Sequence, residues 1–257
     1  MRCSARTLVA PGAGVIRANQ LKTFALQPFD ATVLAGIAQV DARGSFQKAC
    51  VSITDALDGI GRGMICWAAV KLYYATFYLA RCRLLRIGEC HLYIDRTPYC
   101  LNSQAGATIQ KGKGTSHEFA FTRFIARFGG ATSLSQTING DPPLTWLKSV
   151  REEIQYTSPR FSDGGICTFL PRITQANATE VIRAYLGRDQ LVLAFDPDHA
   201  VVAFPLLFFC ETANEIVTGG DSMLTTAECS FLVQRLRIRR DSVGQIGQIF
   251  RKITGLD

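Results

Sequence analysis

Residues 64–87 (MICWAAVKLYYATFYLARCRLLRI) constrain the fold more than any other part of the chain. The first seventeen of them carry one charge, Lys71, and three arginines follow within the next six positions. A membrane-spanning helix needs about 20 predominantly apolar residues, and the lysine inside the run and the arginines after it argue against one here. A helix that is apolar on nearly all sides packs on several neighbours. We therefore expect a continuous, largely buried core helix over residues 64–87.

The aromatic side chains of this segment cover more than one helical face: Trp67, Tyr73, Tyr74, Phe77 and Tyr78. If all of them pack in the core, truncation leaves a cavity. Replacing Trp67 or Phe77 by alanine should then cost about 3–5 kcal/mol of stability.

Most of the remaining chain also has helical periodicity. The expected helices cover residues 31–40 (with Asp30 as N-cap), 45–57, 116–128, 144–156 (after two prolines), 177–186, 225–239 and 243–253. Between the second of these and the long helix, Gly59, Gly61 and Gly63 predict an interhelical turn. Residues 91–94 alternate like a strand, and the apolar run 200–210 is interrupted by Pro205.

The fold class expected from these elements is mainly α with a few short strands. A length of 257 residues allows one large domain, or a domain with an added lobe. We divide the chain into an N-terminal arm with a short helix (1–44), a helical domain (45–165) and a C-terminal helical lobe (166–257).

The charge balance permits an anionic partner. Lys and Arg number 28 against 21 Asp and Glu, which gives a net charge of +7. Most of the basic residues are arginines, whose planar guanidinium groups bind phosphates and carboxylates through two parallel hydrogen bonds. The alternative, a basic surface that is simply solvated, remains open because net charge bears on association and not on fold.

Cysteine usage predicts a reducing compartment. Nine cysteines are scattered without a CxxC pair, which is typical of buried thiols in a cytoplasmic protein. The N-terminal stretch Leu8–Ala10 is broken by Pro11 and Gly12, so we expect no signal peptide. We also expect no membrane partner.

Other chemical motifs are incomplete. Residues 106–113 (GATIQKGK) miss the spacing of a phosphate-binding loop, and Gly114 stands where a magnesium-binding Ser or Thr is needed. The three histidines, His91, His117 and His199, lie far apart in the sequence and form no HExxH motif. The expectation is therefore no cofactor and no metal site.

Two segments carry a family resemblance. Residues 67–81 (WAAVKLYYATFYLAR) and 150–156 (VREEIQY), with the turn 114–118 (GTSHE) between them, resemble the HEPN (higher eukaryote and prokaryote nucleotide-binding) family of all-α domains. The resemblance covers about residues 45–165 and implies a HEPN-like helical bundle. The alternative is a generic helical bundle whose tyrosines and phenylalanines are plain core.

The resemblance also implies which residues would be needed for catalysis. HEPN ribonucleases carry Arg-x4-6-His on one helix and cleave RNA without metal at a dimer interface. Arg151 matches the arginine, but Tyr156 stands where the shortest spacing requires histidine, and no histidine follows at the longer spacings. A histidine exchanges protons near neutral pH, whereas a phenol does so near pH 10. His117 is a further candidate, although nothing in the sequence brings it to Arg151.

We therefore expect a non-catalytic HEPN-like accessory subunit that binds a protein or nucleic-acid partner, as a homodimer or in a multi-subunit complex. The family resemblance places such subunits in prokaryotic antiviral defence or toxin–antitoxin systems. Two alternatives remain: a metal-independent ribonuclease using Arg151 with Tyr156 or His117, and a structural partner of an ATPase without nucleic-acid contact.

A basic cluster near the C-terminus is the candidate docking surface. Its side chains are able to project from one side of a helix while apolar neighbours pack. Its members are Arg235, Arg237, Arg239, Arg240, Arg251 and Lys252. A solvated surface without a partner is the alternative.

Overall fold

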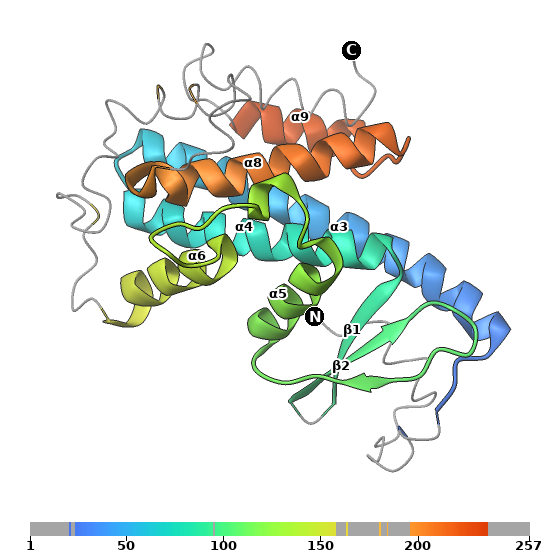
Figure 1. Ribbon diagram of the computed structural model, residues 1–257. Coiled ribbons are helices and arrows are strands. Elements are labelled where there is room, and N and C mark those ends of the chain that lie inside the picture. The colour runs from blue at the N-terminus through green and yellow to red at the C-terminus, as the bar shows by residue number, and fades with distance from the viewer. Residues whose placement is uncertain are drawn as a thin grey trace. The chain divides into compact units, whose positions relative to one another are not determined.

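The computed structural model describes residues 21, 24–94, 96–157, 163, 180, 184 and 196–235. In these residues the chain is mainly helical with one small antiparallel sheet (Figure 1), which confirms the mainly-α expectation. The chain divides into two compact units that alternate along the sequence. The hairpin unit combines the described residues up to Phe46 with Ala80–Phe128, and the helical unit combines Gln47–Leu79 with the described residues from Gly129 onward. The sequence-based division at residues 44 and 165 stays a prediction.

Helix α3 (Pro28–Gly61) replaces the two helices expected over 31–40 and 45–57. Asp30 lies in its first turn and is not the N-cap. The helix continues through Gly44 because its buried stripe is uninterrupted: Ala31, Leu34, Ala38, Ala42, Phe46 and Ala49 recur every three or four residues. One glycine in a helix interior costs only about 1 kcal/mol, which this burial exceeds.

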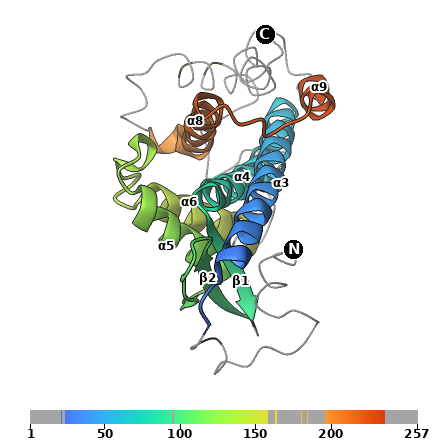
Figure 2. The ribbon, with the colours of Figure 1, turned by 90° about the vertical axis from the view of Figure 1, so that its right-hand side faces the viewer.

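The glycine-rich segment after α3 is an interhelical turn, as predicted. Gly63 has φ of 78°, a left-handed conformation that glycine adopts without strain. The Met64 N–H donates to the Gly59 carbonyl at 2.8 Å and closes the turn. Within the helical unit, α3 and the following helix therefore run side by side in opposite directions (Figure 1 and Figure 2).

Helix α4 (Ile65–Arg86) confirms the continuous, largely buried helix expected over residues 64–87. At its first turn the Asp163 carboxylate accepts hydrogen bonds from the N–H groups of Cys66 and Trp67, at 2.7 and 3.0 Å. The expectation that Trp67 packs in the core is wrong, because this side chain is 40% exposed, whereas Phe77 is buried. The expected cavity cost therefore holds for Phe77 alone.

The sheet of the hairpin unit is larger than the single strand predicted. Strand β1 (Glu89–Ile94) pairs antiparallel with β2 (Thr97–Asn102), which pairs with the short β3 (Gln110–Lys111). Arg96, at φ 64°, forms the tight turn between β1 and β2. The sequence pattern missed β2 because Pro98 cannot donate to a ladder; it lies in the strand with its carbonyl accepting from Gly112 N–H at 2.8 Å.

Helix α5 (Ser116–Phe128) follows the sheet and matches its predicted bounds. Thr115 and Glu118 form a reciprocal capping box: each backbone N–H donates to the other's side chain, at 2.9 and 3.4 Å. The helix packs on one face of the β1–β2 hairpin (Figure 1), where the Phe119 ring lies 4.7 Å from the His91 ring between centroids.

The helical unit adds a short 3-10 helix η1 (Thr132–Leu134), helix α6 (Pro143–Glu152), the π-helical turn η2 (Glu153–Thr157), and helices α8 (Pro197–Thr218) and α9 (Thr226–Arg235). The α-helix expected over 144–156 thus ends at Glu152, and the chain continues as the wider π-helical turn η2. Of the helix expected over 177–186, only Glu180 and Ala184 are described, both as helical, and the helix expected over 243–253 lies outside the described residues.

Helix α8 runs through Pro205, contrary to the expected interruption. An internal proline costs about 3 kcal/mol, through a lost hydrogen bond and a steric clash. Burying each large apolar side chain contributes about 1.5–3 kcal/mol, and Phe204, Phe208 and Phe209 are all fully buried. Burial on every side of the helix therefore outweighs the proline.

By length and composition, residues Asp198–Thr218 of α8 are also able to cross a membrane. They form the one such stretch among the described residues, and 72% of its most apolar part is buried within the protein. This burial is typical of the core helix of a soluble protein.

Candidate nucleic-acid interface

One side of α4 carries aromatic and basic side chains that are not buried. Trp67, Lys71, Tyr74 and Tyr78 are spaced four, three and four residues apart, so successive turns present them on one face. Trp67 is exposed and the other three are half-buried. We call these four residues the α4 stripe. All of them belong to the helical unit.

Arg151, near the end of α6, lies against three tyrosine rings. The carbon at the centre of its guanidinium is 5.2, 5.7 and 5.1 Å from the ring centroids of Tyr73, Tyr74 and Tyr156. Its Nη2 donates to the Tyr74 hydroxyl at 3.2 Å. A guanidinium within about 6 Å of a ring face is attracted by the ring quadrupole, so these rings hold the cation in place.

The carboxylate paired with Arg151 among the described residues is that of Glu152, and this ion pair is long. The Arg151 side chain is 13% exposed, and Glu152 Oε1 lies 3.9 Å from Nη1, beyond hydrogen-bond distance. The buried Nε has no hydrogen-bond partner among the described residues. Burial lowers the pKa of Arg151, but the hydrogen bond to Tyr74 and the electrostatic effects of Tyr74, Tyr156 and Tyr73 together outweigh burial, so the pKa is raised overall. Arg151 is therefore a fixed cation with unused donors.

Tyr156 meets Arg151 because the helix widens. Residues five apart on an α-helix point about 140° away from each other. In η2 the turn is π-helical, and the Tyr156 ring comes to 5.1 Å from the guanidinium while staying 71% exposed. Single π-helical turns are frequent at functional sites. The result is an exposed aromatic ring beside a held cation.

One lysine of the α4 stripe, Lys71, and one beside it, Lys48, add positive charge to this face. Lys48 Nζ lies 6.0 Å from the centroid of the Tyr78 ring, and Lys71 Nζ is 3.2 Å from Asp55 Oδ2. Both partners of the Lys71–Asp55 pair are partly exposed, and such pairs contribute little because water screens them. We call the α4 stripe together with Arg151 and Tyr156 the Tyr–Arg patch.

The structure brings together two of the three predicted catalytic residues. Arg151 and Tyr156 are in contact, whereas His117 lies in the first turn of α5, in the hairpin unit. Among the described residues, Arg151 contacts three tyrosine rings and pairs with Glu152, and no histidine contacts it.

The predicted basic cluster is described at one position only. Arg235 ends α9 and donates from Nη2 to Oδ1 of Asp55, the same carboxylate that pairs with Lys71. The other members lie outside the described residues: Arg237, Arg239, Arg240, Arg251 and Lys252.

The sequence analysis missed the exposed side of α4 because it interpreted the aromatic residues as core. The signal was present in the spacing: the one charge of the apolar run, Lys71, lies on the same face as Trp67, Tyr74 and Tyr78. Comparisons with protein-family models, with curated proteins and with solved structures find no match to this chain.

Proposed function

We propose that this chain is a non-catalytic, HEPN-like subunit that binds single-stranded RNA through the Tyr–Arg patch. The observation that carries the proposal is the Arg151 guanidinium, held by three tyrosine rings with no carboxylate oxygen within hydrogen-bond distance among the described residues. The biological setting proposed from the family resemblance is a prokaryotic defence or toxin–antitoxin system.

Stacking supplies the first part of the binding energy. Trp67 and Tyr156 expose their rings, and a base stacked on an aromatic side chain gains about 1–3 kcal/mol whatever its sequence. At 1.5 Å per residue, Trp67 and Tyr78 are about 16 Å apart along α4. A strand lying along this face would therefore meet successive rings, as on other single-strand-binding surfaces.

Phosphate contacts supply the second part. Arg151 keeps its charge at every physiological pH, and Nη1 has no hydrogen-bond acceptor within reach among the described residues. A phosphate is able to accept from this edge without displacing a carboxylate. The net charge of +7 favours approach of a polyanion.

The same geometry argues against catalysis. Metal-independent RNA cleavage needs a group that takes and returns protons near neutral pH, and such transfer contributes about 10²–10⁴ to the rate. Among the described residues, the groups in contact with Arg151 are three phenols and the Glu152 carboxylate, and no imidazole is among them. The absence of an imidazole from these contacts supports the non-catalytic proposal.

Fluorescence anisotropy with a labelled oligouridylate tests the proposal. We expect the intact chain to bind, and R151Q or Y156A to bind at least fivefold more weakly. R96Q is the matched control, since it removes the same charge from an exposed turn of the hairpin unit. No binding by the wild type at low salt, or equal loss in R96Q and R151Q, would overturn the proposal.

Incubation of the RNA in chelator tests the non-catalytic part. We expect the RNA to stay intact with wild type and with R151Q. Cleavage by the wild type that disappears in R151Q and persists in R96Q would instead establish the ribonuclease alternative.

A further inference from the structure

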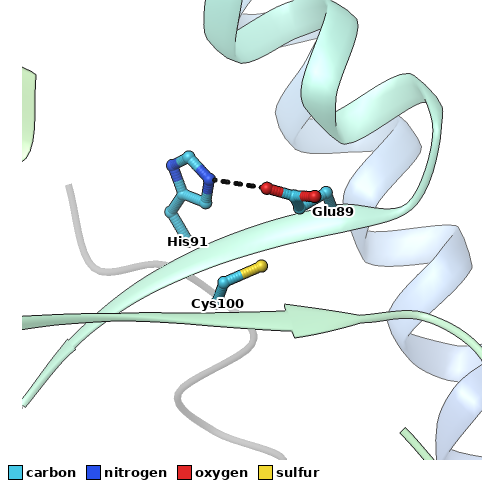
Figure 3. Close-up of side chains that lie close together, drawn as sticks. All are labelled: Glu89, His91 and Cys100. Carbon is cyan, nitrogen blue, oxygen red and sulfur yellow. Dashed lines mark hydrogen bonds and ion pairs between the residues drawn. The ribbon is translucent and has the colours of Figure 1, made fainter. Parts of the chain in front are cut away.

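The β1–β2 hairpin gathers four metal-binding side-chain types on one face. Glu89 and His91 are two residues apart on β1, so they point to the same side. The register places Cys100 opposite His91 and Asn102 opposite Glu89. Figure 3 shows the Glu89 carboxylate, the His91 ring and the Cys100 sulfur gathered on this face.

The distances suit a small tetrahedral ion. Glu89 Oε1 and His91 Nε2 are 3.5 Å apart, and one ligand atom from each of Glu89, His91 and Cys100 lies within 4.8 Å of the others. Bonds of about 2.0–2.2 Å to nitrogen and oxygen at a tetrahedral centre separate those atoms by about 3.3 Å, and a sulfur bond of about 2.3 Å gives about 3.6 Å. The Glu89–His91 spacing already matches, and the sulfur needs a shift of about 1 Å.

A second observation points to a missing partner at this face. The Oδ1 atom of Asn102 is buried and accepts no hydrogen bond from the described residues. Buried carbonyl oxygens are almost always satisfied, by protein, water or an ion. Its register position opposite Glu89 makes this oxygen the candidate fourth ligand.

We propose that Glu89, His91 and Cys100, with Asn102 as the fourth ligand, form a zinc site. Sulfur, imidazole nitrogen and oxygen together are the ligand set of Zn²⁺, whereas Mg²⁺ and Ca²⁺ take oxygen ligands. Binding forms a zinc–sulfur bond, and the thiol proton of Cys100 leaves to the buffer.

Two arginines bind the same Glu89 carboxylate as the proposed metal, and they affect both its orientation and its affinity for the metal. Oε2 accepts from Arg123 Nη2 and Arg127 Nε at 2.8 and 2.9 Å, and Oε1 accepts from Arg123 Nε at 2.6 Å. A metal on Oε1 replaces the long contact to His91 and leaves both arginines in place, where they orient the carboxylate as outer partners. Their positive charges weaken metal binding, so removal of the half-exposed Arg127 should strengthen it.

This site departs from the sequence-based expectation of no metal. The ligands follow no known spacing because they come from two strands, and only the antiparallel register brings Cys100 to His91. A pattern search along the chain does not see a cross-strand pair.

The test is zinc titration of the full chain, stripped with chelator, in competition with a colorimetric chelator. We expect one Zn²⁺ per chain, no binding of Mg²⁺, and at least tenfold weaker zinc binding in C100S and in H91Q. C90S is the matched control, because Cys90 is an equally buried neighbour on β1 that points to the opposite face. Co²⁺ should give a thiolate-to-metal charge-transfer band in wild type and C90S that is absent in C100S.

Absence of stoichiometric zinc binding, or equal loss in C90S and C100S, overturns the proposal. Circular dichroism shows whether each variant folds. If C100S and H91Q do not fold, R127Q decides: the proposal predicts at least threefold tighter zinc binding, and unchanged or weaker binding contradicts it. None of these outcomes depends on RNA binding.

Discussion

In the hairpin unit, Arg123 and Arg127 both donate to the buried carboxylate of Glu89; in the helical unit, Arg151 rests on three tyrosines and meets no carboxylate within hydrogen-bond distance among the described residues. A cation whose charge is matched by a buried anion has its donors in use. A cation held by rings keeps its charge and part of its donor capacity for another molecule. The first arrangement serves the fold, and the second is available for binding an anion.

The largest expected effect lies at Glu89. E89Q removes the charge that Arg123 and Arg127 share and leaves two guanidinium groups facing a neutral amide. Breaking a buried ion pair by removing one partner costs about 3–5 kcal/mol. Urea unfolding should show this loss of stability; a loss under 1 kcal/mol would mean that the network does not support the fold.

Phe77 and Trp67 allow a buried and an exposed aromatic residue to be compared within one helix, α4. F77A should cost about 3–5 kcal/mol, because Phe77 is buried and its removal leaves a cavity. W67A should cost clearly less, because Trp67 is 40% exposed. The same W67A variant should weaken RNA binding by stacking loss, at about 1–3 kcal/mol. Equal destabilisation by both variants would show that Trp67 packs in the core, and would contradict this prediction.

Acid should destabilise the metal-free hairpin unit. The pKa of Glu89 is held well below its usual 4.5, because hydrogen bonds from His91, Arg123 and Arg127 outweigh the desolvation that raises it. Burial lowers the pKa of His91 below its usual 6.5. In both cases the unfolded chain takes up protons first, so stability falls as pH drops below 6.5 and again below 4.5. Urea midpoints measured in chelator from pH 8 to 4 should decline, and a rising midpoint would contradict the assignment.

Alkali should act through two buried thiols, Cys100 and Cys210, of which Cys100 lies in the hairpin unit. Burial raises the pKa of Cys100 from 9.0 to about 12. The unfolded chain therefore loses this proton above pH 9 while the folded chain keeps it, and stability falls by up to about 1.4 kcal/mol per pH unit. Unfolding midpoints between pH 8.5 and 10.5 should decline less steeply in C100A than in wild type; identical slopes would contradict the shift.

The sequence predicted elements where burial follows a local pattern. The apolar run located α4, and the capping pair Thr115–Glu118 accompanies an α5 whose bounds were predicted correctly. It failed where tertiary packing overrides a local signal. Two helices were expected over 31–40 and 45–57, and Pro205 was expected to interrupt the run 200–210, yet buried side chains keep α3 and α8 continuous.

The residues of the candidate sites were likewise predicted where they are close in sequence and missed where tertiary contacts place them. Arg151 and Tyr156 are close in sequence, so a short motif found them, although their contact depends on the π-helical turn. The exposure of Trp67 depends on which side of α4 its neighbours cover, and the His91–Cys100 pair depends on strand register. Both are set by contacts between segments distant in sequence, which periodicity does not encode.

Unfolding free energy and RNA affinity, measured together in R151Q and R127Q, show most directly whether the two arginine clusters have separate roles. Each variant removes one guanidinium charge. R151Q should bind oligouridylate at least fivefold more weakly. The slope of the logarithm of its RNA association constant against the logarithm of salt concentration should be about 0.7 less steep, because one phosphate contact is lost. R151Q should lose little stability. R127Q should lose stability, because its hydrogen bond to buried Glu89 is broken, and bind RNA as wild type does. R151Q with wild-type affinity, or R127Q with the same loss of RNA binding as R151Q, would contradict the distinction between the two clusters.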